Sequence, residues 1–524
     1  MSIALPPPAS PQLGTIEQLQ PQANGGVVVT YQNYQLHVAA AGVLDEATLN
    51  KVIAAADNVS NAVRNISSAA YAAGFPAAQV LYVASGKDVY VVVKPGEISA
   101  VHANDALKPY FEGIESAKPL TARELESHRA LASMLADRAG YNIYPTFEPD
   151  GNGGMVLDLE KNVKVQDPTQ ISLDFGNPGN RFSSRYFLDL GIKTASNYGD
   201  EFRVASREGL PNVDSAAGGD YHEQNLSWNR VTPRGVFGVA GRYINYSAAP
   251  NNVAIIGRIW TVEGIYLYPI MADFNMRWTA QGKVDYTDNK KELDSTATTS
   301  AFEYAREKYP SIEAATSYAR NIGFLDHLWN IEVGGTVRKG LGDNENTTSF
   351  PLNADEKYLL ARGTANLKLF WQPNLSKSWN PNLTSGVELS GQYSKDTLPE
   401  QQQWVLGGQG NLTTALPGVA QGDMGYLLRA YTEIGGITAP YLTGLDLRPK
   451  VFIETGSASY ESAKLGQASG DQQLADVGVE LGFKYRQWLD GSLAYAKEVN
   501  NDNINAQTLN GSNARMYFRI GVKY

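Results

Sequence analysis

Few residues of this sequence have the types and spacing that catalysis or metal binding requires. The chain has no cysteine, which excludes thiolate metal sites, disulfides and cysteine nucleophiles. Acidic residues are plentiful, but no pattern pairs two of them as acid and base, and no GxSxG, P-loop or Rossmann motif occurs in a fitting context. None of the histidines has metal-ligand spacing; they are His37, His102, His128, His222 and His327. The sequence therefore predicts no enzyme, no metal site and no cofactor.

Composition and charge narrow the class of protein. Apolar residues make up 43% of the 524 residues, but no run of about 18 occurs, so no transmembrane helix is predicted. The net charge of −10 argues against nucleic acid as a partner, because such binding needs clustered Lys and Arg. The 29 tyrosines fit the aromatic girdles of a membrane barrel, and a tyrosine-rich soluble β-protein is the alternative. Residues 1–14 lack the features of a signal peptide, so an exported chain is expected to be a mature form with an added Met.

The N-terminal third has a mixed α/β pattern. Residues 1–30 are rich in Pro, Gln and Gly and predict a flexible leader. In 31–96 a strand, two helices and two further strands follow one another. The second helix is expected to end at the helix-breaking run Gly74-Phe75-Pro76. This segment therefore predicts one small α/β domain.

The same order of elements returns in residues 97–164. A short helix is expected over 103–111, and a long helix over 121–139. The long helix begins with the capping pair Thr121 and Glu124. Two consecutive copies of one supersecondary unit indicate a repeat, and hence a second domain like the first.

From residue 165 to residue 524 the sequence reads as strand after strand. Segments 476–485 and 515–524 alternate strictly between apolar and polar side chains, which places each kind on its own face. In a soluble sandwich the apolar face packs inside, whereas in a transmembrane barrel it meets lipid. Short and long loops alternate when counted back from the C-terminus, as in bacterial barrels. Strands of roughly 10 residues would make an antiparallel barrel of about 16 strands.

Short motifs in the correct order resemble a known family. They are the first barrel strand with its turn (171–179), a Tyr-Pro strand (264–270), and the entry (398–408) and exit (422–429) of a long loop. With two POTRA-like domains ahead of a barrel, the chain resembles the two-partner secretion transporters (TpsB), relatives of the filamentous haemagglutinin and haemolysin exporters. The resemblance covers residues 31–524.

The long loop, about 396–423, is the main candidate site. Its flanks are Gly407-Gly408 and Gly422-Asp423. Long loops are usually functional or disordered. The resemblance implies that this loop folds back into the barrel lumen; a disordered surface loop is the alternative, and Asp423 would then be a turn residue.

The loop departs from the family pattern at its tip. In the family a V-R-G-Y tip carries an Arg that meets the Asp of an F-x-D-x-G motif on the barrel wall. Here the matching wall motif is Phe452-Ile-Glu454-Thr-Gly456, with Glu in place of Asp, and no Arg occurs between 363 and 428. The residues at the tip are Leu412, Thr413, Thr414 and Ala415. The usual ion pair between loop and wall therefore cannot form.

Strand phase offers Glu454 another partner. Segment 447–457 places Glu454 on its polar face, and the neighbouring segment 424–434 places Arg429 on a polar face. If both faces point into the lumen, Arg429 neutralises Glu454; a solvated lumenal carboxylate is the alternative. The loop tip would then dock through threonine hydroxyls and packing. Such neutral contacts would hold it less firmly than an ion pair.

The resemblance implies a non-enzymatic role. It suggests an outer-membrane translocator with its N-terminal domains in the periplasm, where they would catch an unfolded exoprotein through its secretion domain. Outer-membrane lipids and the barrel-assembly machinery are the other expected partners. The second hypothesis is an outer-membrane protein assembly factor, although such insertases usually carry more than two POTRA domains.

Overall fold

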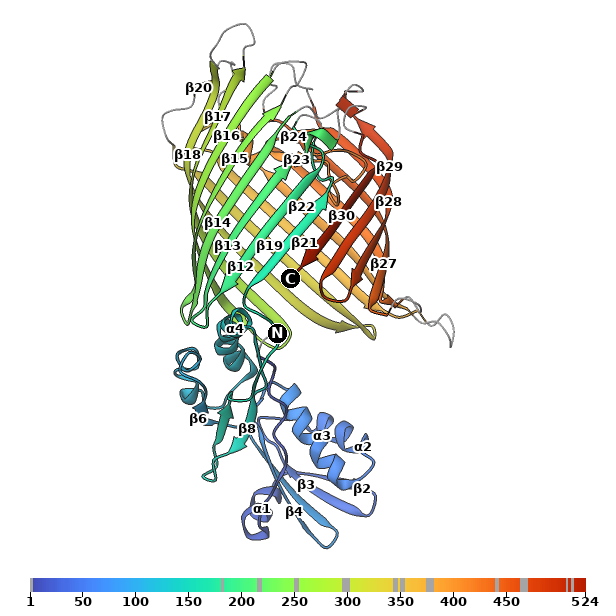
Figure 1. Cartoon of the computed structure of the whole chain (residues 1–524). Coiled ribbons are helices and arrows are strands. Elements are labelled where there is room, and N and C mark those ends of the chain that lie inside the picture. Colours follow the sequence, from blue (N-terminus) through green and yellow to red (C-terminus); the bar gives the residue numbers. More distant parts are fainter. Residues whose placement is uncertain are drawn as a thin grey trace.

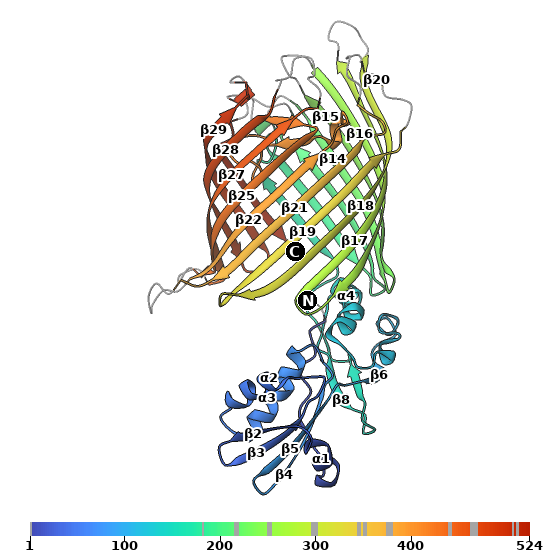
Figure 2. The same ribbon diagram turned by 180° about the vertical axis from the view of Figure 1, so that it is seen from behind.

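A computed structural model shows two small α/β domains joined end to end with a β-barrel (Figure 1). The view from behind shows the same arrangement, with the domains below the end of the barrel that carries the short turns (Figure 2). We call this the proximal end, and the opposite end distal. The described residues are 3–180, 183–213, 219–248, 254–294, 302–342, 347–348, 354–373, 381–438, 443–461, 470–505, 508–509 and 513–524.

The first domain is a five-stranded sheet with the strand order β1-β4-β5-β3-β2. Helices α2 and α3 cover one face, and each begins at a side-chain cap: Asp45 accepts from Thr48 N–H, and Asn58 from Asn61 N–H. The core between this face and the helices includes Leu36, Ile53 and Ile66. The elements are β1 (Gln12–Leu13), α1 (Ile16–Ala23), β2 (Val27–Tyr31), β3 (Tyr34–Ala39), α2 (Glu46–Ala54), α3 (Val59–Ala72), β4 (Gln79–Ser85) and β5 (Asp88–Lys94).

The N-terminal residues differ from the flexible leader that the composition predicted. Strand β1 pairs in parallel with β4, and helix α1 buries Leu19 and Ala23 against the second face of the sheet. Ile3 is fully buried and bridges to Ile143 of the second domain. These apolar contacts outweigh the local Pro and Gln content, so the first domain begins well before residue 31. Helix α1 lies on this domain and not in the barrel lumen (Figure 1).

The second domain has a three-stranded sheet of order β6-β9-β8 and one long helix, α4. Thr121 accepts from Glu124 N–H at the start of α4, as the capping pair predicted. The helix expected over 103–111 is absent: only one 3-10 turn, Lys108–Tyr110, forms there, because Pro109 has no N–H to continue a helix. The elements are β6 (Ile98–His102), η1 (Lys108–Tyr110), η2 (Ile114–Ser116), α4 (Ala122–Arg138), β7 (Tyr141–Ile143), β8 (Thr146–Pro149), β9 (Met155–Asp158) and β10 (Asn162–Lys164), which pairs with β7.

The rest of the chain forms a closed antiparallel barrel of 16 strands, as predicted. Two short pieces, β20 (Thr347–Thr348) and β26 (Ile437–Thr438), extend its ladders. A 3-10 turn, η3 (Pro211–Val213), lies in one connection. The barrel strands are β11 (Gln170–Gly176), β12 (Phe187–Ala195), β13 (Asp200–Gly209), β14 (Tyr221–Thr232), β15 (Gly235–Ala248), β16 (Ala254–Ala272), β17 (Met276–Asp294), β18 (Phe302–Phe324), β19 (His327–Gly340), β21 (Leu359–Trp371), β22 (Asn382–Tyr393), β25 (Met424–Gly435), β27 (Leu445–Ser459), β28 (Gln472–Tyr485), β29 (Leu489–Asp502) and β30 (Met516–Lys523).

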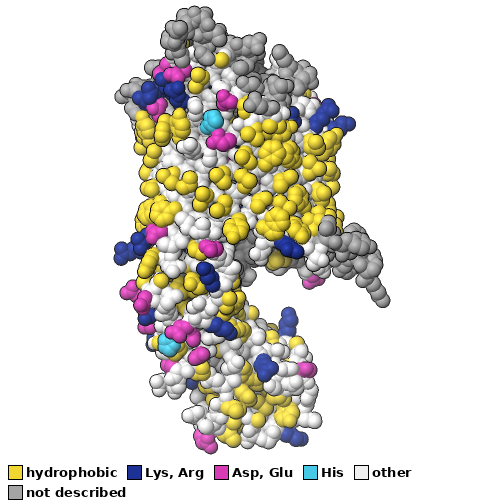
Figure 3. All heavy atoms as spheres, viewed as in Figure 1, with side chains coloured by type: hydrophobic (Ala, Val, Ile, Leu, Met, Phe, Trp, Pro, Cys, Tyr) yellow, Lys and Arg dark blue, Asp and Glu magenta, His cyan; other side chains and the backbone are white. Residues whose placement is uncertain are grey.

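Side chains alternate between the two faces of the barrel wall. Val451 and Ile453 are more than half exposed on the outside, whereas the intervening Phe452 is 3% exposed and lies inside. The space-filling view shows a broad band of apolar side chains across the face of the barrel in view (Figure 3). Such a band is typical of a barrel wall in contact with lipid. No helix in the described part of the chain is long and apolar enough to cross a membrane.

The seam between β11 and β30 closes the barrel, and Asn177 lengthens it beyond the strand ends. Its side-chain oxygen accepts from Phe518 N–H at 2.7 Å, and its amide nitrogen donates to the Met516 carbonyl at 2.9 Å. One side chain thus satisfies two backbone groups where the short ladder ends.

We expect Asn177→Ala to weaken this seam. The substitution leaves two backbone groups without their partners, at a cost of about 1–3 kcal/mol. The temperature at which the folded barrel loses its fast mobility on gels should fall by a few degrees. Asn197→Ala, at an exposed turn, is the control. Equal transition temperatures for both variants would show that Asn177 does not hold the seam.

Candidate functional site

The long loop between β22 and β25 folds inward and forms a hairpin of its own, β23 (Trp404–Leu406) and β24 (Ala420–Gly422). The hairpin packs against the inner wall at β27 and β28. Gly407 has a φ of +104°, and a Cβ there would lie 2.1 Å from the carbonyl oxygen of Leu416. Only glycine fits this turn. Gly408, next to it, also has a positive φ. The loop is therefore a folded element and not a disordered surface segment.

The loop tip is bound to the wall by two carboxylates. The backbone N–H of Thr413 donates to Oε2 of Glu454 at 2.7 Å, and that of Thr414 donates to Oδ2 of Asp476 at 2.8 Å. Both carboxylates are fully buried, as is the side chain of Leu412. Leu412 has a φ of +66°, which a bulky side chain seldom adopts. The strained turn presents two successive amides to the two acids, and each acid accepts one hydrogen bond.

Arg429 supplies the positive charge beneath these acids. Its Nε lies 3.0 Å from Oε1 of Glu454, as strand phase predicted, although the two atoms form an ion pair without hydrogen-bond geometry. A second nitrogen donates to Glu480 at 3.4 Å. The guanidinium lies 5.0 Å from the ring centre of Phe452. The wall motif thus forms one buried cluster of Arg429, Glu454, Asp476 and Phe452.

Apolar packing surrounds the tip. Leu412 and Ala415 lie in one buried cluster with Ala458 and Leu474 of the wall. The hydroxyl of Tyr517 donates to the carbonyl of Ala415 at 2.7 Å. Gly456 leaves room for the side chain of Leu406, which approaches within 3.2 Å of where a Cβ would stand. These residues therefore shield the tip from water.

The base of the loop has a separate anchor. Asp423 is fully buried and accepts from Leu398 N–H at 2.9 Å and from Glu461 N–H at 3.2 Å, so it joins both ends of the loop and the next connection. Gly422 packs directly on the backbone of Ser459. A 3-10 turn, η5 (Glu400–Gln402), contacts another part of the barrel wall, where Glu400 forms an ion pair with Lys291 of β17 at 2.5 Å. The loop is thus held at β17 at its base and at β27 and β28 at its tip.

The structure corrects one expectation for the tip. Backbone amides bound to carboxylates hold it together with apolar packing, whereas the sequence predicted threonine hydroxyls and packing. The hydroxyl of Thr413 instead accepts from Gly410 N–H within the loop. Asp476 was not among the predicted site residues. Strand phase could have indicated it, because Glu454 and Asp476 are direct partners in the register of β27 and β28.

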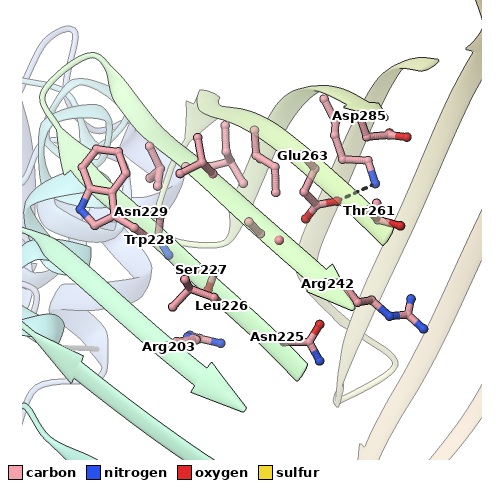
Figure 4. A pocket seen from close by; sticks show the side chains of 18 of the residues that line it. Arg203, Asn225, Leu226, Ser227, Trp228, Asn229, Arg242, Thr261, Glu263 and Asp285 are labelled. Atoms are coloured by element: carbon pink, nitrogen blue, oxygen red, sulfur yellow. Dashed lines mark hydrogen bonds and ion pairs between the residues drawn. The ribbon is translucent and has the colours of Figure 1, made fainter. Parts of the chain in front are cut away.

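Between the loop base and the second domain lies a lumenal cavity of about 700 Å³. Arg203, Asn225 and Arg242 extend into it from β13, β14 and β15, with Glu263 on β16 beside them (Figure 4). Glu263 is paired with Lys283 at 3.4 Å, the contact drawn in the close-up. The cavity is lined by charged and polar groups and is suited to a hydrated or polar occupant.

Helix α4 closes the proximal side of this cavity. Arg138 donates to the carbonyl of Gly199 at 2.5 Å and bonds Asn229, and Tyr110 donates to the carbonyl of Val231 at 2.9 Å. Burial lowers the pKa of Arg138 and raises that of Tyr110. The second domain is therefore docked on the barrel turns by specific contacts. Among the described residues, no group of acidic or histidine side chains could hold a metal ion.

Comparison with solved structures identifies the architecture. CdiB from Escherichia coli matches with a TM-score of 0.67 and 14% identity, over 95% of this chain and 91% of that one. CdiB from Acinetobacter baumannii matches with a TM-score of 0.61 at the same identity and coverage. BamA from Haemophilus ducreyi lacking POTRA domains 1–3 matches with a TM-score of 0.50 and 14% identity, over 95% of this chain and all of that one. At the level of sequence, no family model and no curated protein matches. The chain has a TpsB-like fold of POTRA-like domains and a closed barrel, as the resemblance predicted.

Proposed function

We propose that this chain is an outer-membrane translocator that carries an unfolded partner protein through its barrel without catalysing a reaction. The observation that supports this most is the combination of a polar lumen with a folded loop that is held inside it by hydrogen bonds and ion pairs. A loop held by such contacts can leave the lumen without unfolding the barrel, whose own ladder is closed.

The N-terminal domains are proposed to receive the partner in the periplasm. A sheet edge can bind an extended chain by strand addition, in which backbone hydrogen bonds give affinity. The outer strands of the two sheets, β2 and β8, end their sheets without a further strand among the described residues. The similarity to CdiB is the reason to expect a secreted exoprotein as the partner.

The alternative is an assembly factor that inserts other barrels into the membrane. The similarity to BamA supports it, as does the short seam between β11 and β30, which has only five registered pairs. We favour translocation because the folded loop occupies the lumen and is bound to its wall.

Expression of the chain together with a candidate partner exoprotein, in a Gram-negative host that lacks both, distinguishes the two functions. Translocation predicts that the exoprotein reaches the medium only when the chain is present, while the amounts of the host's own folded porins stay constant. The chain should fractionate with outer membranes, require detergent, and shift in mobility on heating. Loss of folded porins on depletion from the native host, with unchanged export, would favour the assembly factor. A monodisperse preparation without detergent would refute both.

A further inference from the structure

The first domain binds a segment of its own chain at a sheet edge. Strand β1 pairs in parallel with β4 through two residue pairs, Gln12 with Leu81 and Leu13 with Tyr82. The N–H of Gly14 donates to the carbonyl of Tyr82 at 3.0 Å. Helix α1 follows at once and covers the sheet face beside this edge. We call residues 12–23, which include β1 and α1, the latch.

The latch is held weakly compared with the residues before it. Its ladder engages two of the seven residues of β4, and Leu13 is 77% exposed. Helix α1 has eight residues, contains Pro21, and begins at Thr15 without a side-chain cap. A helix this short has little stability of its own. Leu19 and Ala23 are the two latch side chains that are buried.

Both ends of the latch are fixed. Before it, Arg129 bonds the carbonyl of Ile3, and the hydroxyl of Ser67 donates to the carbonyl of Ala9 at 2.7 Å. After it, the chain enters β2, which pairs with β3 over its whole length. The latch can therefore leave β4 while its ends remain attached. It would return readily, because tethering gives it a high effective concentration at the edge.

We propose that the β4 edge is a binding site for an extended segment of the partner protein, and that the latch is its built-in competitor. This proposal rests on the proposed function. The latch shows what the site accepts, an extended backbone that pairs with Leu81 and Tyr82. An apolar side chain then packs on the sheet face formed by Tyr90 and Val92, where Leu19 now lies. A competitor that is bound most of the time lowers the apparent affinity for the partner in proportion to the open fraction.

The test compares Leu19→Asp with Gln18→Asp in the full-length protein. Both add one negative charge to α1, but only Leu19 is buried. The probe is fluorescein-labelled, reduced and carboxymethylated α-lactalbumin, a permanently unfolded polypeptide, with binding followed by anisotropy. Release of the latch should raise the affinity of Leu19→Asp by roughly tenfold or more, because it no longer buries a leucine. Gln18→Asp should bind like the unmodified protein.

A crosslinked variant provides a second test that does not depend on the folding of Leu19→Asp. The chain has no cysteine, so Leu13→Cys with Tyr82→Cys introduces the only thiols. A short bis-maleimide should lock the latch on β4 and reduce probe binding, while the same protein without the reagent keeps it. Equal binding before and after crosslinking, or by Leu19→Asp and Gln18→Asp, overturns the latch and leaves capture by the domains standing. Failure of every variant to bind the probe overturns both proposals.

Discussion

Replacing Glu454 and Asp476 together by alanine is expected to release the loop tip from the barrel wall. The change removes the acceptors of the buried Thr413 and Thr414 amides, so both of these hydrogen bonds between tip and wall are lost. Together these contribute about 3 kcal/mol or more, which corresponds to a shift of roughly a hundredfold in the docked fraction of the loop. Single-channel conductance in planar bilayers should rise, and export of the partner should fall steeply.

The control for this double variant is Glu332→Ala with Glu388→Ala. Neither residue has a hydrogen bond or an ion pair with another described residue, and this variant also loses two carboxyl groups. A variant lacking residues 400–420 gives the conductance of a barrel without the loop in its lumen. If the Glu454 and Asp476 double variant conducts like the control pair, the carboxylates do not hold the loop.

Strand phase alone predicted the pairing of Arg429 with Glu454. Alternation along a strand fixes which side chains share a face, and a short connection fixes which strands are neighbours. The two residues are direct partners in the register of β25 and β27, and their side chains are in contact. The same reasoning extended by one strand would have found Asp476. The backbone amides of Thr413 and Thr414 could not be found in this way, because every residue carries an amide and only the strained turn at Leu412 aims these two.

The N-terminal residues show the limit of composition as a guide. Four prolines in residues 1–11 make this segment a poor helix and a poor strand, and so predict flexibility. The structure instead fixes it by contacts with distant residues: Ile3 with Ile143, and Ala9 with Ser67. Such distant partners cannot be inferred from the local sequence. The helix expected over 103–111 failed for a local reason, since Pro109 was visible in the sequence.

Removal of residues 3–164 is expected to abolish export while leaving a folded barrel. Its strands form a closed ladder with one another, from β11 round to β30, so they do not need the domains for strand pairing. The deletion does remove the contacts of Arg138 and Tyr110 with the proximal turns and uncovers Val231, which is 1% exposed in the intact chain. These losses affect the proximal turns and the proximal end of β14, and they leave the strand ladder intact. The truncated chain should therefore still show heat-modifiable mobility in outer membranes, with export of the partner at the background level.

A deletion limited to residues 3–96 separates capture by the first domain from closure of the barrel by α4. In this variant the contacts of Arg138 with Gly199 and of Tyr110 with Val231 can still form, so the conductance should stay close to that of the full chain. Export should nevertheless fall strongly, because the β4 edge and the rest of the first sheet are gone. The larger deletion should conduct more than the smaller one, since only it opens the proximal side of the lumenal cavity that Arg138 lines. Normal export by the truncated barrel would show that the partner enters the lumen without the N-terminal domains.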